Sequence, residues 1–148
     1  MKLDLESVEN RGLLAYLGRD GKSPPIANPA TVEDPYQCCG AHPDVVERVW
    51  DQLGAGLPRK SRALVHGTPA LVHTSAGVVL AIALGTSYAL RLPAEACATP
   101  PGSTLPSVHT FRTSGDTLDL ATFGPTWRFG NWHKEEVAWI TSEHARLK

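Results

Sequence analysis

The sequence is poor in cysteine and has no long apolar run. It contains three cysteines, Cys38, Cys39 and Cys97, and an odd number with an adjacent pair does not suit a disulfide framework. Reduced thiols in a cytosol are the simpler interpretation. The apolar run at residues 78–84 is far shorter than the roughly 18 residues that a membrane-spanning helix needs, and residues 1–6 lack the apolar core of a signal peptide. These absences predict a cytoplasmic protein with no membrane contact.

The chain also lacks an excess of either charge. It has 14 Lys and Arg against 15 Asp and Glu, a net charge of −1, whereas nucleic-acid binding draws most of its affinity from a basic surface. The densest basic stretch, residues 59–62, is typical of a solvated loop. Nucleic-acid binding through Arg59, Lys60, Arg62 and Arg91 is therefore the least favoured of three functions. The 148 residues, 42% hydrophobic and 20% charged, are typical of one globular domain, residues 1–148.

Familiar catalytic motifs are missing. A zinc-protease motif needs two histidines four residues apart with a glutamate between them, and His133 and His144 are eleven apart. The sequence has no nucleophile elbow, no phosphate-binding glycine loop and no dinucleotide-binding fingerprint. We therefore predict no catalytic residue and no cofactor, and favour a protein without enzymatic activity. Catalysis that does not use these motifs stays open.

The apolar run at residues 78–84 predicts the central strand of a sheet, because it is short and flanked by Gly77 and Gly85. Side chains alternate along a strand. Regular alternation would place bulky residues on one face, namely Val78, Leu80, Ile82 and Leu84, and the small residues Val79, Ala81 and Ala83 on the other. The small face would then leave room for a helix or a partner to approach.

Short turns separate this run from its neighbours, which predicts an antiparallel meander. The expected strands are residues 62–66, 70–74, 77–84 and 87–92, followed by 108–112, 117–123 and 126–129, with the first turn at Gly67-Thr68-Pro69. Helices are expected at residues 3–17, 43–53 and 132–145, the last with Asn131 as its cap. The predicted fold is α+β: an antiparallel sheet of five to seven strands, covered mainly on one face by the helices at 43–53 and 132–145.

Residues 67–93 resemble a known family. The stretches at 67–73, 77–81 and 88–93 are similar to the meander of the YjbR-like (MmcQ) proteins and to the N-terminal domain of the competence regulator TfoX. The resemblance implies a helix, a small apolar antiparallel sheet and a closing helix. A DNA-binding role, sometimes attached to the YjbR group, does not suit a net charge of −1. We therefore take from the resemblance an expectation about architecture only.

Aromatic residues are concentrated near the C-terminus. Five of the ten lie within 17 residues: Phe123, Trp127, Phe129, Trp132 and Trp139. Tryptophan buries a large rigid surface and is enriched at binding hot spots, although these residues also suit a core. The favoured hypothesis is a non-catalytic module that binds a protein partner, as an immunity or adaptor protein does, through Trp127, Phe129 and Trp132.

The alternative is a small-molecule site or weak enzyme, between the sheet and the loop at residues 18–41. Its candidate residues are Cys39, His42, Arg91 and His109, of which the last two can orient an anionic ligand. Cys38, Cys39 and His42 offer soft metal ligands, but no second cluster completes a site, so no metal is predicted. The sequence leaves the choice between monomer and dimer open.

Overall fold

The structure, a computed structural model, describes residues 3–4, 8–18, 26, 42–84, 87–91, 111–113, 116–118, 127–130, 132 and 134–147. The helices are α1 (Val8–Leu17), α2 (Pro43–Glu47), the π-helical turn η2 (Arg48–Leu53), the 3-10 turn η3 (Arg59–Ser61) and α4 (Glu135–Arg146). The strands are β1 (Arg62–Val65), β2 (Thr68–Val72), β3 (Val79–Leu84), β4 (Ser87–Arg91), β5 (Phe111–Thr113), β6 (Asp116–Leu118) and β7 (Trp127–Phe129). Among the described residues, none of the helices is both long and apolar enough to span a bilayer.

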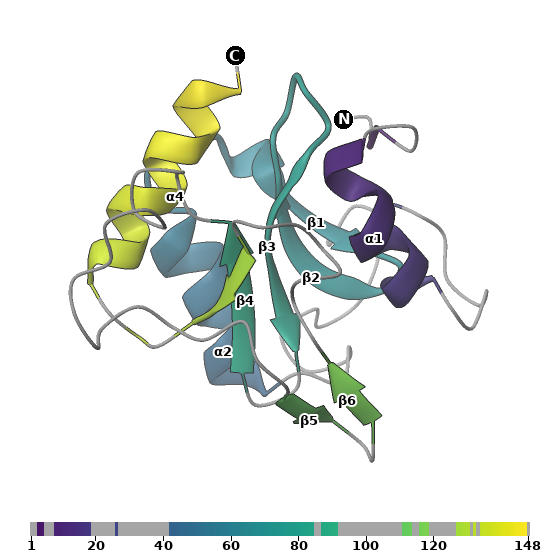
Figure 1. Cartoon of the computed structure of the whole chain (residues 1–148). Helices are drawn as coiled ribbons and strands as arrows, with labels where there is room; N and C mark the ends of the chain where they lie inside the picture. Colours follow the sequence, from purple (N-terminus) through teal and green to yellow (C-terminus); the bar gives the residue numbers. More distant parts are fainter. Residues whose placement is uncertain are drawn as a thin grey trace.

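The strands form an antiparallel sheet in the order β1-β2-β3-β4-β7, and β5 pairs with β6 in a separate two-stranded sheet. The predicted α+β class with an antiparallel sheet is confirmed. In Figure 1 the sheet stands between α2 and α4 on its left and α1 on its right. The helices predicted at 43–53 and 132–145 pack on one face of the sheet, as expected, and α1 covers the second face.

Helix α2 starts where the sequence predicts. Pro43 occupies its first turn, and the Nδ1 atom of the preceding His42 accepts a hydrogen bond from the Asp44 amide at 3.1 Å. The helix continues into η2, so the predicted 43–53 segment is helical throughout. Its apolar side chains are buried against the sheet: Val45, Val46, Val49, Trp50 and Leu53.

The other two helices begin later than predicted. The amide of Asp4 donates to the carbonyl of Gly77 at 3.0 Å, and Asn10 donates to the Asp4 carbonyl at 2.7 Å. This segment is therefore attached to the turn before β3 and does not extend α1 backwards to residue 3. Helix α4 begins at Glu135 after Lys134, whose side chain makes no capping bond. The predicted cap, Asn131, lies outside the described residues.

The turn between β1 and β2 differs from the prediction. It consists of His66 and Gly67, with φ values of 48° and 79°, which suit the tight two-residue turns of hairpins. Thr68 and Pro69 belong to β2, where Pro69 lies opposite Leu64. A proline is tolerated there because β2 pairs with β3 only from Ala70 onward, so no ladder hydrogen bond is lost.

A β-bulge in β3 overturns the predicted division into a bulky and a small face. Leu71 pairs with Ala81 and Val72 pairs with Val79, which leaves Leu80 as the extra residue. Leu80, Ala81 and Ala83 consequently contribute to one core cluster, and Val79 and Ile82 to the other. Each face therefore carries both large and small side chains.

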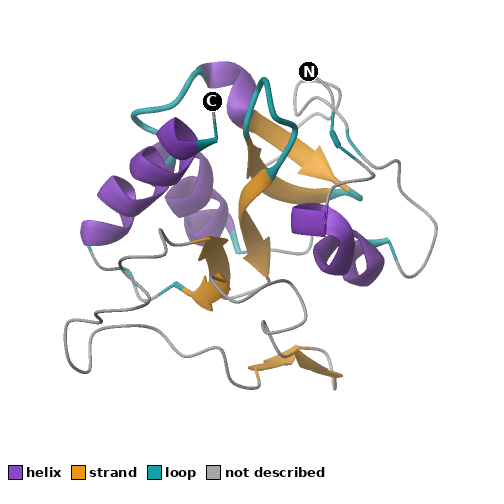
Figure 2. Cartoon of the chain, turned by 45° about the horizontal axis from the view of Figure 1, so that its top comes forward, coloured by secondary structure: helices purple, strands orange, loops and turns teal. Residues whose placement is uncertain are grey.

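The two faces of the sheet carry separate cores, as the layers in Figure 2 indicate. One core packs η2 and α4 against the sheet, and Trp50 anchors it through a hydrogen bond from Nε1 to the Ala70 carbonyl at 2.9 Å. The other core holds Leu13, Leu17 and Trp127. Buried Asn10 pins α1 there, because its side chain donates to Gly77 at 2.8 Å and accepts from Val79 at 3.0 Å. The helix positions are thus fixed by polar as well as apolar contacts.

Candidate functional site

A buried polar cluster lies where η2 and α4 meet β4. It consists of Arg48 from η2, Tyr88 from β4 and Glu136 from α4. Trp132, which precedes α4, lies over it. The cluster forms because the two helical segments pack on the same face of the sheet, each bringing a charged residue into an otherwise apolar interface.

Arg48 is only 5% exposed, and each of its three guanidinium nitrogens has a partner within the protein. Its Nη2 atom lies 3.0 Å from Oε1 of Glu136, its Nε donates to the Tyr88 hydroxyl at 3.2 Å, and its Nη1 donates to Gln52 at 3.0 Å. Burial alone would lower the pKa of Arg48, but the hydrogen bonds to Tyr88 and Glu136 outweigh it and raise the pKa. The guanidinium is therefore firmly charged and paired.

Tyr88 is the centre of the cluster. Its hydroxyl donates to Oε1 of Glu136 and accepts from Arg48 and from the backbone amide of Trp132 at 2.8 Å. Burial, together with the hydrogen bond to Glu136, raises the pKa of Tyr88 to about 12. Tyr88 therefore stays protonated at neutral pH, and its hydroxyl both donates and accepts hydrogen bonds.

Trp132 is the surface residue that this cluster supports. It is 50% exposed, the large hydrophobic side chain that stands out on the described surface. Its ring lies 5.7 Å from the guanidinium carbon of Arg48 and meets the Tyr88 ring edge-on at 5.5 Å. Its backbone has φ 57°, a conformation that bulky residues rarely adopt. The hydrogen bond from its amide to Tyr88 fixes this conformation.

Gly130 lets the chain pass close to Tyr88. Its amide donates to the Tyr88 carbonyl at 2.7 Å, and a Cβ placed on it would lie 1.8 Å from Cε2 of the Tyr88 ring. Any side chain at this position would collide with Tyr88. The close packing of Gly130 against Tyr88 therefore determines the course of the backbone towards Trp132.

The geometry of the cluster is better suited to positioning Trp132 than to catalysis. Glu136 is fully buried and Arg48 nearly so, which leaves neither group open to a substrate. Tyr88, held in its protonated form, is no base at neutral pH. The cluster contacts the exposed Trp132 through its ring, by way of Tyr88 and Arg48, and through its backbone amide.

The structure separates the three aromatic residues that we predicted to bind a partner. Trp127 is 0% exposed and packs in the core on the α1 side of the sheet, so its indole ring is not presented at the surface. Phe129 belongs to β7, and its side chain lies outside the described residues. Trp132 is exposed, as partner binding requires.

The residues of the alternative ligand site have different neighbours. His42 is exposed and caps α2. Arg91 is 7% exposed, with its guanidinium carbon 5.9 Å from the Trp127 ring and Nε 3.9 Å from Oε2 of Glu143. Cys38, Cys39 and His109 lie outside the described residues. Within the described ranges, no group of three or more His, Cys, Asp and Glu residues is arranged to hold a metal ion.

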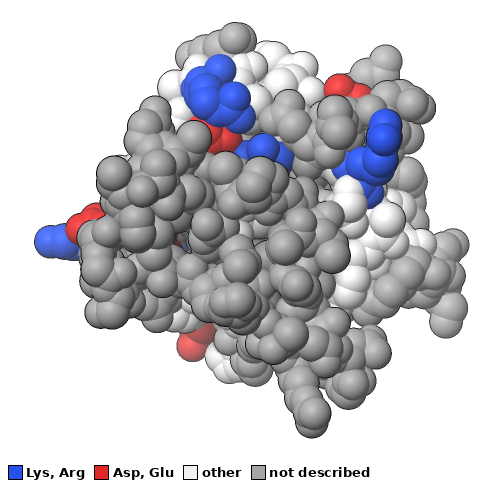
Figure 3. Space-filling view, in the orientation of Figure 1, with Lys and Arg blue, Asp and Glu red and all other residues white. Residues whose placement is uncertain are grey.

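The basic residues considered for nucleic-acid binding are also divided. Arg62 pairs with Asp51 at 2.8 Å, and Arg91 is buried. Arg59 and Lys60 are exposed. On the face shown in Figure 3, the described Lys and Arg side chains stand in separate groups and do not form a continuous stripe. This distribution gives no support to a nucleic-acid interface.

Sequence reasoning missed Arg48, Tyr88 and Glu136. A signal for Arg48 is present, since it lies between Val46 and Val49 within the apolar stripe of a helix. A similar signal exists in α4, where Glu136 lies four residues before buried Ile140, on the same helix face. A charged residue on an apolar helix face predicts a buried partner, although the sequence does not say which one.

The expected likeness of residues 67–93 to the YjbR-like and TfoX proteins finds neither support nor contradiction among known proteins. Comparison of the chain with protein-family models, with curated proteins and with solved structures finds no match.

Proposed function

We propose that this chain is a non-catalytic cytoplasmic binding module, of the immunity or adaptor kind, that recognises a protein partner through Trp132. The observation that carries the proposal is an exposed indole ring held in a strained backbone conformation by a buried hydrogen-bond network. The partner would cover the ring and complete its burial.

The arrangement has energetic costs for the stability of the fold, which supports a role in binding. A left-handed conformation at a residue other than glycine costs about 1–2 kcal/mol. Half of the indole surface gains nothing from burial within the chain. Arg48 and Glu136, which hold Tyr88, also lose hydration when buried. Strained residues kept in place by their surroundings cluster at functional sites.

The same arrangement favours tight association. A rigid aromatic side chain loses little conformational entropy when it docks, so more of its burial energy appears as affinity. Here the ring is held from two sides, by the edge of Tyr88 and by the charge of Arg48. Tryptophan and arginine are also the residue types most enriched at binding hot spots.

The test is co-purification from the native host, with tagged wild-type protein compared with the Trp132→Ala variant. We expect the wild type to recover one protein in a fixed stoichiometry. With the purified pair, the variant should bind at least about 30-fold more weakly, because a hot-spot residue contributes about 2 kcal/mol or more.

Ser142→Ala is the matched control, since Ser142 is exposed on α4 and should bind like the wild type. Thermal unfolding must show that Trp132→Ala remains folded. A folded Trp132→Ala variant that captures the partner at wild-type affinity would refute the role of Trp132. Failure of the wild type to recover a stoichiometric partner would refute the proposed function itself.

A further inference from the structure

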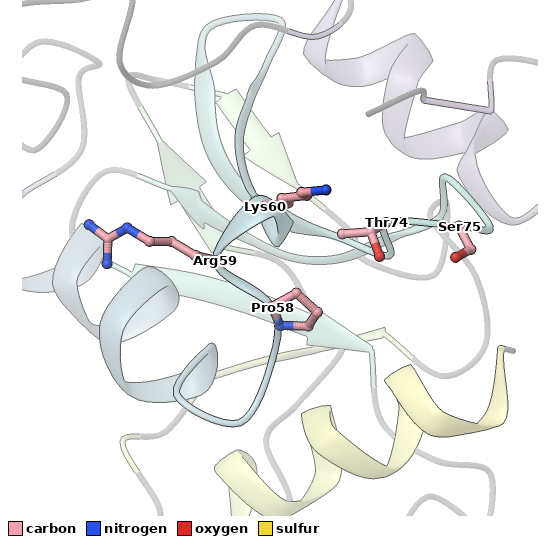
Figure 4. Close-up of a pocket in the computed structure, with 5 residues that line it drawn as sticks. All are labelled: Pro58, Arg59, Lys60, Thr74 and Ser75. Carbon is pink, nitrogen blue, oxygen red and sulfur yellow. The ribbon is translucent and has the colours of Figure 1, made fainter.

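A second feature, independent of Trp132, is a pocket between η3 and the turn that leads from β2 to β3. Its volume is about 620 Å³, and the described residues that line it are Pro58, Arg59, Lys60, Thr74 and Ser75. Small-molecule sites usually measure about 300–1,000 Å³. In Figure 4 the Lys60 side chain extends on the same side as Thr74 and Ser75, whereas the Arg59 guanidinium extends away on the other side of Pro58.

Both walls of the pocket are held in place by hydrogen bonds. In the turn after β2, Nδ1 of buried His73 accepts from the amides of Ser75 at 3.1 Å and Ala76 at 2.9 Å, and its carbonyl accepts from Gly77 at 2.9 Å. In η3, the amide of Ser61 donates to the Pro58 carbonyl at 2.9 Å. The hydroxyl groups of Thr74 and Ser75 and the stem of Lys60 therefore project from ordered backbone, which lowers the entropy lost on binding.

The chemistry of the lining is cationic and rich in donors. Lys60 and Arg59 carry positive charge, Thr74 and Ser75 carry hydroxyl groups, and none of the five lining residues is acidic. Arg62 pairs with Asp51 at 2.8 Å. By contrast, neither Arg59 nor Lys60 forms an ion pair with another residue that the structure describes. The positive charge at the pocket is therefore not neutralised from within the described chain.

We propose that this pocket binds a small anionic ligand that carries a phosphate group. Lys60 supplies the charge, Thr74 and Ser75 donate hydroxyl hydrogen bonds to the phosphate oxygens, and Arg59 adds to the positive field from the rim. Pro58 supplies an apolar surface for the remainder of the ligand. The site goes beyond the proposed protein binding and uses residues that do not contact Trp132.

Amide chemical shifts provide the test, with pyrophosphate as the probe and inorganic phosphate as a smaller second probe. We expect saturable shifts confined to the amides of residues 59–60 and 74–76. Lys60→Met should weaken pyrophosphate binding about tenfold, since a charged hydrogen bond contributes about 1.4 kcal/mol or more. Ser75→Ala should weaken it less, because the lost hydrogen bond comes from a neutral donor.

Lys134→Met is the matched control, because Lys134 is an exposed lysine before α4 and does not line the pocket. It should bind pyrophosphate like the wild type. Shifts that never saturate, or an equal loss in Lys134→Met, would show diffuse attraction to surface charge and overturn the proposal. Binding of a mixed-sequence oligonucleotide without binding of pyrophosphate would overturn it in favour of nucleic acid. Lys60→Met should still bind the partner of Trp132, which separates the two proposals.

Discussion

The guanidinium of Arg48 and the carboxylate of Glu136 form a buried ion pair, 3.0 Å between Nη2 and Oε1, across 88 residues of sequence. It connects the helical segment after α2 with the C-terminal helix, and Tyr88 from the sheet bonds to both of its members. Three separate elements thus meet at one polar centre, on which the position of Trp132 depends.

Replacement of Glu136 by glutamine should strongly destabilise the fold. The variant keeps the shape of the side chain but removes the carboxylate charge that pairs with buried Arg48, which costs about 3 kcal/mol or more. Urea unfolding measures the loss. The double variant Arg48→Met with Glu136→Leu should recover much of it, because it removes both charges. A loss below about 1 kcal/mol in Glu136→Gln would contradict the buried pairing.

Stability should fall at alkaline pH through Tyr88. Its pKa is raised to about 12 in the fold, so the folded state holds this proton more tightly than the unfolded state does. The resulting stabilisation is complete below the ordinary pKa of about 10 and is lost as the pH rises towards 12. Unfolding of the wild type and of Tyr88→Phe across this range should show a steeper decline in the wild type. Parallel declines would count against the raised pKa.

Gly130→Ala should disturb the cluster even though it adds one methyl group. The new Cβ would lie 1.8 Å from the Tyr88 ring, so either the ring or the strand must move. We expect a destabilisation of about 1–3 kcal/mol, the usual cost of overpacking. Gly56→Ala is a useful comparison, because its Cβ would meet only the side chain of Thr141, at 3.1 Å. Equal stability of the two variants would contradict the tight contact.

Comparing the stabilities of two variants of Trp132 measures the cost of its strained backbone conformation. Both Trp132→Gly and Trp132→Ala lose the indole ring, but glycine adopts a φ of 57° without penalty. We therefore expect the glycine variant to be more stable than the alanine variant by about 1 kcal/mol, measured by chemical unfolding. At an unstrained site glycine would be the less stable of the two. Both variants should lose partner binding, which distinguishes the stability of the fold from the function of the ring.

Much of the architecture follows from local pattern. The apolar stripe of residues 43–53 and its proline start correctly predict a helix, and short turns correctly predict antiparallel neighbours. The errors have local physical causes. The sequence predicts this turn one residue later than the observed His66-Gly67, because proline usually marks a turn, whereas Pro69 occupies a strand position with no ladder bond to lose. The bulge at Leu80 is invisible in a run of similar apolar residues, and it shifts the face of every side chain that follows.

The candidate site was predictable only in part. The sequence singles out the tryptophans, but it cannot tell a core tryptophan from an exposed one. Trp127 is buried because β7 joins the sheet beside β4, and Trp132 is exposed because the strained backbone turns it outward over Tyr88. Both outcomes depend on contacts between residues more than 30 positions apart.

The amino-acid sequence by itself determined the α+β class, the main helices and the antiparallel pairing, because periodicity and turn chemistry act between near neighbours. The tertiary structure alone decided that both faces of the sheet are covered and that Arg48, Tyr88 and Glu136 meet. It also decided which tryptophan faces solvent. A buried charge requires a partner, and only the packing of distant elements determines which residue supplies it.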